Sequence, residues 1–232
     1  MNFIRKIIEN LSKEDEILYL ELKNILGFSP KDLHYYKKAF IHRSIKEIDK
    51  TTGLPQNYER LEFLGDAMIS SVIAAYLFEK VPSGDEGYLT QMRSKIVSRE
   101  HLNELGRDLD LLRFVKSSVA KSKFGDDIHG NVFEALVGAI YLDRGYHFCE
   151  KFIFNRVIIP HVDIEKLEGK IISYKSLLIE WCQKEKKTFK YQVYEDTGND
   201  DVRHFSVKLH IDSKIVAKGR ATSKKKAEEI AS

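Results

Sequence analysis

The sequence has few cysteines and no long apolar run. Only two of its 232 residues are cysteine, Cys149 and Cys182, and they lie far apart without a paired spacing. This argues against a disulfide framework and against a cysteine-based zinc site. The longest apolar stretch, residues 69–78, contains serines and is shorter than the roughly 18 residues that a membrane helix needs. We therefore expect no membrane span and a location in a reducing cytoplasm.

A strong charge of one sign is also missing. The chain has 38 Lys and Arg against 35 Asp and Glu, a net charge of +3 that identifies no partner by itself. Residues 173–232 hold 13 of the cations and 9 of the acids, so the positive charge lies in the tail. With 43% hydrophobic and 31% charged residues, the composition is that of a folded protein, and the length favours two domains.

The hydrophobic pattern changes once along the chain. Residues 1–159 show apolar positions at spacings of three and four, typical of successive helices, and residues 1–16 read as an amphipathic first helix. Pro160 and a charged segment then predict a linker over residues 160–172. From 173 the order is a helix, three alternating strands and a lysine-rich helix, an α+β unit of the form αβββα. The sequence stops shortly after that helix begins, so the helix is short or the sequence is truncated.

Three acids share one stripe of a predicted helix in "NYERLEFLGDA", residues 57–67. Glu59, Glu62 and Asp66 are spaced by three and four, which places them within roughly 60° of one another around the helix axis. A solvated face is the simpler interpretation. Like charges at these spacings repel one another, however, and a hard divalent cation such as Mg²⁺ would offset the repulsion through carboxylate ligands.

A second helix, "GNVFEALVGAIYLD" at 130–143, carries Asn131 and Glu134 on one face with apolar residues on the other. Alone this pair is uninformative. The loop "DEG" at 85–87 adds Asp85 and Glu86, for which an ordinary acidic turn is the simpler interpretation.

These segments together resemble a known family. "NYERLEFLGDA" resembles the signature motif of bacterial ribonuclease III, and "GNVFEALVGAIYLD" resembles its second acidic motif. "AFIHRS" at 39–44 and "MRSKIVSREHLNELG" at 92–106 are similar to its other helical landmarks. The αβββα tail is similar to a double-stranded RNA-binding domain, so the resemblance covers nearly the whole chain. It implies an all-α catalytic domain followed by a small α+β RNA-binding domain.

The resemblance also implies a metal site. Glu62, Asp66, Asn131 and Glu134 are the expected ligands of Mg²⁺, with Mn²⁺ as a possible substitute, and Asp66 and Glu134 are the expected catalytic residues. The family's usual residue at position 131 is Asp. An amide oxygen still coordinates, but it brings one less negative charge, so we expect weaker metal binding unless nearby Asp126 or Asp127 compensates.

Other positions are expected at a second metal ion, at a subunit contact or on RNA. Glu59 and Glu86 match outer acids that assist a second metal or the dimer seam. Phe63 matches an aromatic that packs into the partner subunit of a homodimer, although an ordinary core phenylalanine is equally consistent with the sequence. In the tail, Glu180 and the triplet Lys224, Lys225 and Lys226 match RNA-binding positions. Ile179 and Asp201 depart from the tail pattern, which predicts a weaker or less selective RNA contact.

The implied activity is hydrolysis of double-stranded RNA to 5′-phosphate and 3′-hydroxyl ends with short 3′ overhangs, in the processing of ribosomal and other RNA precursors. No small-molecule cofactor beyond the metal is expected. Two alternatives remain open at this point. One is a double-stranded RNA-binding protein of the same fold with weak or lost cleavage. The other is a helical phosphohydrolase of small nucleotides, which would leave the basic tail unexplained.

Overall fold

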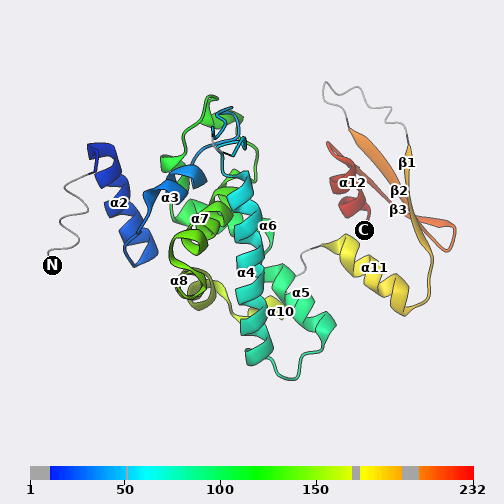
Figure 1. Cartoon of the computed structure of the whole chain (residues 1–232). Helices are drawn as coiled ribbons and strands as arrows, with labels where there is room; N and C mark the ends of the chain where they lie inside the picture. The colour runs from blue at the N-terminus through cyan, green and yellow to red at the C-terminus, as the bar shows by residue number, and fades with distance from the viewer. Residues whose placement is uncertain (1–10, 51, 169–172, 195–203) are drawn as a thin grey trace. The chain divides into compact units, whose positions relative to one another are not determined.

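In a computed structural model of the chain, residues 11–50, 52–168, 173–194 and 204–232 are described. The chain divides into two units, Met1–Glu168 and Gly169–Ser232 (Figure 1). The first is helical and the second combines helices with a three-stranded sheet, which confirms the predicted fold class. The helix expected over residues 1–16 lies outside the described residues for its first ten. The described chain begins just before α2, whose N-terminus is capped by the Ser12 side chain.

Helices and the loops between them make up the described part of the first unit. In chain order they are α2 (Lys13–Leu26), α3 (Leu33–Ala39), α4 (Glu59–Lys80), α5 (Glu86–Ile96), α6 (Arg99–Asp108), η1 (Leu111–Phe114), η2 (Lys121–Lys123), α7 (Ile128–Arg144), α8 (Tyr146–Ile153), η3 (Phe154–Ile158), α9 (Ile159–His161) and α10 (Ile164–Glu168).

The centre of this unit is α7, which packs against α3, α4, α6 and α8. Because neighbours surround it, α7 buries ten of its residues, including Val132, Phe133 and Leu136, and leaves few positions for polar side chains. Asn131 and Glu134 are two of those few, and both are only partly buried.

Two glycines allow α4 and α7 to lie unusually close together. A Cβ atom added at Gly65 of α4 would lie 1.7 Å from the backbone oxygen of Glu134, and one at Gly138 of α7 would lie 2.2 Å from the backbone oxygen of Leu61. Both distances are far shorter than any normal contact, so only glycine fits at either position. The contact brings the acids of the two helices to the same place.

By length and composition α4 is the one described helix that could cross a membrane. In the structure it lies across the first unit (Figure 1) and contributes Leu61, Ile69 and Ile73 to the hydrophobic core. Its apolar composition is explained by that packing.

The predicted linker, residues 160–172, is wrong in its first part. Residues up to Glu168 belong to the first unit, and α10 packs against α5. The Lys95 ammonium donates hydrogen bonds to the backbone oxygens of Leu167 at 2.8 Å and Glu168 at 3.1 Å, which occupies carbonyls that the end of α10 leaves unpaired. The charged sequence showed no sign of α10, because Lys95, whose hydrogen bonds hold the end of this helix, lies about 70 residues earlier in the chain. Residues 169–172 lie outside the described part of the chain.

The second unit contains α11 (Tyr174–Lys184), β1 (Phe189–Tyr194), β2 (Phe205–Ile211), β3 (Lys214–Ala221) and α12 (Lys224–Ala231). The strands form an antiparallel sheet in the order β1-β2-β3, with Val193 opposite Val207 and Val207 opposite Gly219. Val207 and Leu209, two positions apart on β2, are both buried as the alternation predicts, and the neighbouring Ser206 is buried as well. Residues 195–203, which follow β1, lie outside the described residues.

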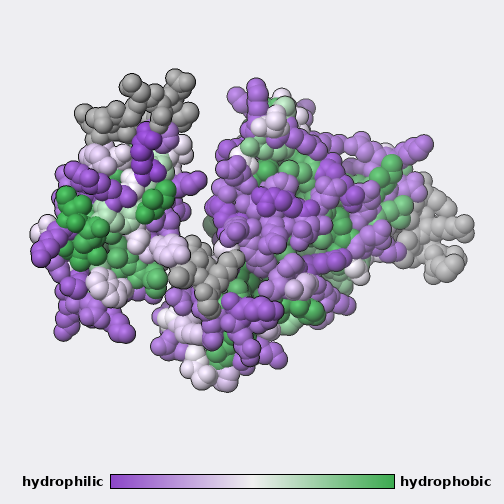
Figure 2. All heavy atoms as spheres, turned by 180° about the vertical axis from the view of Figure 1, so that it is seen from behind, coloured by the Kyte–Doolittle hydropathy of each residue, from purple (hydrophilic) through white to green (hydrophobic). Residues whose placement is uncertain are grey.

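The core of the second unit is small. Its buried hydrophobic cluster consists of Val207, Ala221 and Ala227, with Tyr191 and Phe205 packed against it. Trp181 remains 43% exposed, and Figure 2 shows hydrophobic residues on the surface of this unit among the charged ones. Helices α11 and α12 are joined by an ion pair of 2.6 Å between Lys175 and Glu228.

The close contact of α4 and α7 generates a stability prediction. Gly65→Ala and Gly138→Ala should each lower the free energy of unfolding by about 1–3 kcal/mol or more, because the helices must separate to admit a methyl group. Gly125→Ala is the matched control, since nothing lies within 4 Å of a Cβ at that position. Chemical denaturation of the three variants measures the difference, and equal stabilities would mean that the helices tolerate separation.

Candidate active site and RNA-binding surface

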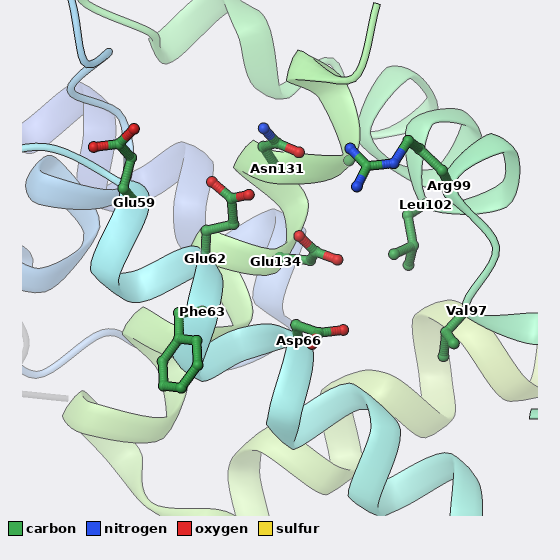
Figure 3. Close-up of a pocket in the computed structure, with 10 residues that line it drawn as sticks. Glu59, Glu62, Phe63, Asp66, Val97, Arg99, Leu102, Asn131 and Glu134 are labelled. Carbon is green, nitrogen blue, oxygen red and sulfur yellow. The ribbon is translucent and has the colours of Figure 1, made fainter. Parts of the chain in front are cut away.

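One pocket of about 470 Å³ in the first unit collects the acids of both sequence motifs. It opens between α4, α6 and α7, and Figure 3 shows the side chains around it. Its lining residues are Glu59, Glu62, Phe63, Asp66, Val97, Arg99, Leu102, Gly130, Asn131 and Glu134.

All four residues expected as metal ligands line this pocket. Glu62 and Asp66 come from adjacent turns of α4, and Asn131 and Glu134 come from the first turns of α7. Figure 3 shows the three carboxyl groups and the Asn131 amide pointing toward a shared space. The structure thus brings these four side chains to one pocket, as the resemblance implied, although the two motifs lie about 70 residues apart in the sequence.

The clustered charges change the titration of two carboxyl groups. Burial, together with the nearby charges of Asp66 and Glu62, raises the pKa of Glu134 to about 8. Burial and the charge of Glu59 also raise the pKa of Glu62 above its usual range. Arg99 opposes both shifts. With a pKa of about 8, Glu134 keeps its proton at neutral pH in the absence of a cation.

Glu59 lies at the edge of the pocket, and its hydrogen bond and its ion pair are to residues that do not line the pocket. Its carboxylate accepts a hydrogen bond of 3.2 Å from the Asn57 amide and lies 3.9 Å from the Arg43 guanidinium. The structure therefore places Glu59 beside the other acids, in a position separate from the Glu62, Asp66 and Glu134 group.

Phe63 also lies at the edge of the pocket. Its side chain is 79% exposed, and in Figure 3 its ring points away from the carboxylates. The alternative interpretation of Phe63 as an ordinary core residue is wrong for the single chain, because Phe63 lies on the exposed side of α4.

Glu86 is not among the residues that line the pocket. It occupies the first turn of α5 and accepts a hydrogen bond of 3.1 Å from the Thr90 hydroxyl one turn later. Its neighbour Asp85 caps α5 by accepting from the Tyr88 backbone N–H. In this chain the loop acids thus serve the start of a helix, and the predicted second-metal or subunit role of Glu86 stays a prediction.

The sequence patterns did not single out Arg99, a charged residue of the pocket. Arg99 begins α6 and lines the pocket, and it forms an ion pair of 2.9 Å with Asp127. Asp127 does not line the pocket, so it does not compensate there for the neutral Asn131. No spacing in the sequence signals this pair, because it depends on how α6 packs beside the start of α7.

The lysine triplet of the tail forms the first turn of α12. Lys224, Lys225 and Lys226 are all exposed, and the Ser223 side chain caps the helix by accepting from the Lys226 backbone N–H. A helix start combines positive side chains with unpaired backbone N–H groups, both of which suit phosphate. Glu180 lies exposed on α11, the other helix of this unit.

Comparisons with known proteins agree with this organisation. Residues 32–161 match the Ribonuclease-III-like family, and residues 174–232 match the double-stranded RNA binding motif. Ribonuclease 3 of Zunongwangia profunda is 66% identical over all of this chain and 95% of its own length. Ribonuclease 3 of Flavobacterium psychrophilum is 63% identical over all of this chain and 94% of its own. The chain belongs to the ribonuclease III family.

A solved structure of the same family supports the fold of the first unit. The nuclease domain of ribonuclease III from Campylobacter jejuni is 31% identical, with a TM-score of 0.53, over 62% of this chain and 97% of that one. A second structure of that domain, with a TM-score of 0.52, is described as flexible in a region involved in dimer formation. The motifs that suggested ribonuclease III from sequence therefore identify the family correctly.

The pocket of this ribonuclease III chain suits a hard divalent cation. Among the residues that the structure describes, no three His, Cys, Asp or Glu side chains are gathered as a ready metal cluster. Mg²⁺, however, keeps several of its waters and needs only one or two protein carboxylates. Glu62, Asp66 and Glu134 offer oxygen donors, and a cation would favour the ionised form of Glu134, whose pKa is raised by burial and by the neighbouring carboxylates. The donor chemistry therefore fits.

The raised pKa of Glu134 predicts a pH dependence of metal binding. Below pH 8 Glu134 carries a proton that a metal must displace, so Mg²⁺ affinity should rise from pH 6 to pH 8 and then level off. Calorimetry in buffers of different ionisation enthalpy should show release of about one proton near pH 7. In Glu134→Gln no such proton should be released. A wild-type Mg²⁺ affinity that does not change with pH would contradict the assignment.

The lysines of α12 predict a salt dependence of RNA binding. Replacing Lys224, Lys225 and Lys226 with Ala should weaken duplex RNA binding and lower the slope of log affinity against log salt by about 0.9 for each lost phosphate contact, a value taken from B-DNA. Lys184→Ala, which removes one exposed cation from the C-terminal end of α11, serves as a single-charge control. Unchanged binding at several salt concentrations would remove the start of α12 from the RNA surface.

Proposed function

We propose that this chain is a Mg²⁺-dependent endoribonuclease that cuts double-stranded RNA as a homodimer. That it is an endoribonuclease of double-stranded RNA follows from its family, because its Ribonuclease 3 relatives match it over its full length and it carries the RNA binding motif. The metal, the dimer and the form of the products go beyond the family membership and are the parts that we propose. The observation that carries the proposal is the single pocket in which α4 and α7 bring together Glu62, Asp66 and Glu134.

The side chains of the pocket have separate tasks in this proposal. Glu62, Asp66, Glu134 and the Asn131 amide hold Mg²⁺, or Mn²⁺ in its place. A cation held there would make water a better nucleophile and would offset the charge that develops on the phosphate. Glu134, whose pKa lies above neutral, would release its proton to solvent when a cation is held beside it. Attack of water on phosphorus would break the bond to the 3′ oxygen, which leaves a 5′-phosphate and, once that oxygen is protonated, a 3′-hydroxyl.

Loss of cleavage is the less favoured alternative. A neutral Asn131 lowers the charge of the site by one relative to Asp, but three carboxyl groups still face the pocket. A small-nucleotide phosphohydrolase is disfavoured by the RNA binding motif over residues 174–232.

Two subunits would give one cutting site for each strand of a duplex and so a staggered cut. The exposed surface of α4 supports this arrangement. Phe63 and Phe78, near its two ends, are 79% and 73% exposed. Between them lie the small exposed residues Ala67, Ser71 and Ala75, which allow another backbone to approach. Processing of ribosomal and other RNA precursors in the cytoplasm remains a family expectation.

The proposed activity is tested by incubating the purified protein with long duplex RNA, single-stranded RNA and duplex DNA, each with Mg²⁺ or with EDTA. Cleavage of duplex RNA alone, and only with metal, is expected. Glu134→Gln should bind the duplex without cutting it. Binding without cleavage by the wild type would support the inactive alternative, and cleavage in EDTA would contradict the metal.

Phe63 predicts a change of oligomeric state. Phe63→Ala should shift the protein toward monomer in sedimentation and reduce activity more at low protein concentration than at high. Ile48→Ala is the matched control, since Ile48 is also an exposed apolar residue, at 56%, but lies outside α4. A Phe63 variant that stays dimeric would show that the ring does not hold the subunits together.

Asn131 predicts a change of metal affinity. If its amide is a ligand beside Glu62 and Glu134, Asn131→Asp adds a negative charge against the cation and should lower the Mg²⁺ concentration for half-maximal cleavage by about tenfold, or about 1.4 kcal/mol. A Mg²⁺ titration of initial rates on one duplex measures this. An unchanged midpoint would place Asn131 outside the ligand set.

A further inference from the structure

A positive side chain lines the otherwise acidic pocket. Arg99 is the first residue of α6, and the Ser98 side chain fixes the start of that helix by accepting from the His101 backbone N–H. Figure 3 shows the Arg99 guanidinium directed into the pocket, on the side of Asn131 and Glu134. Arg99 is thus the cation among the lining residues, opposite the carboxyl groups of α4.

Its present partner leaves much of the guanidinium open to solvent. Arg99 pairs with Asp127 through Nη1 and Oδ2 at 2.9 Å, yet its side chain is 66% exposed and that of Asp127 is 45% exposed. Exposed ion pairs of this kind contribute little to stability. A guanidinium has five N–H donors, so one contact to Asp127 does not exhaust them. The pair keeps Arg99 at the rim without burying its charge.

The pocket needs such a charge when RNA enters. Glu62, Asp66 and Glu134 repel an approaching phosphate, and a cation held by them neutralises only part of their charge. Arg99 lines the same pocket as these carboxyl groups. A planar guanidinium also matches a phosphate with two parallel hydrogen bonds, which an ammonium cannot do.

We propose that Arg99 donates hydrogen bonds to a phosphate of the RNA strand being cut, next to the carboxyl groups of α4 and α7. Phosphate then exchanges for Asp127 as the partner of the guanidinium. This inference rests on the proposed function for the identity of the substrate. It assigns to the first unit a phosphate contact separate from the lysines of α12.

The competing explanation is structural, since the same ion pair also joins the starts of α6 and α7. Two variants separate the explanations. Arg99→Ala removes the cation together with the ion pair, whereas Asp127→Asn breaks the ion pair and leaves the cation in place. Arg99→Lys keeps the charge but loses the planar donor set. Arg113→Ala is the matched control, because Arg113 is an exposed arginine, paired with Glu21 at 3.1 Å and not lining the pocket.

Binding of duplex RNA is measured in EDTA with each variant in the full-length Glu134→Gln background, where no cleavage occurs. Arg99→Ala should weaken binding several-fold and lower the slope of log affinity against log salt by about 0.9. In the active background it should lower the cleavage rate at limiting RNA by about tenfold at saturating Mg²⁺. Arg99→Lys should restore the slope and part of the rate, and Asp127→Asn and Arg113→Ala should remain near wild type.

Wild-type affinity, slope and rate in Arg99→Ala would overturn the proposal. So would equal losses in Arg99→Ala and Asp127→Asn, which would assign the effect to the ion pair. If Arg99→Ala does not fold, Arg99→Gln provides the same comparison. Failure of the wild type to cut duplex RNA would refute the proposed function instead, while the binding measurements in EDTA would still decide whether Arg99 contacts RNA.

Discussion

Helices α4 and α7 touch backbone to backbone at Gly65 and Gly138, and the position of every acid in the pocket depends on that contact. A methyl group at either glycine would overlap a backbone oxygen of the other helix. Because the helices are this close, Glu62 and Asp66 on one and Glu134 on the other share one small volume. The packing of the core and the chemistry of the pocket are therefore set by the same two residues.

The close contact has an electrostatic cost. Three carboxyl groups near one another, partly out of water, favour a proton on Glu134 and raise its pKa to about 8. A protein selected only for stability would place apolar side chains at these positions of α4 and α7. Repulsion of this kind is useful where a divalent cation binds, because the cation is attracted by the charge that the fold has concentrated. Arg99 at the rim carries the positive charge that would attract the substrate, which is itself an anion.

The sequence predicts much of this arrangement because its decisive features are local. Spacings of three and four place Glu62 with Asp66 and Asn131 with Glu134, and period-two alternation places Val207 and Leu209 in the core of the second unit. Features that depend on tertiary packing were not predicted. The pairing of Arg99 with Asp127 and the capping of α10 by Lys95 each join segments whose proximity no local pattern encodes. The exposure of Phe63 likewise follows from which face of α4 meets α7, and the sequence left its core and surface interpretations equally open.

The central claim is that α4 and α7 together hold one divalent cation. Anomalous diffraction from crystals of the protein soaked with Mn²⁺ tests it most directly. We expect one manganese peak within coordination distance of carboxylate oxygens from both helices, from Glu134 and from Glu62 or Asp66, and its loss in Glu134→Gln. A peak held by residues of one helix alone, or no peak in the pocket at Mn²⁺ concentrations that support cleavage, would contradict the account.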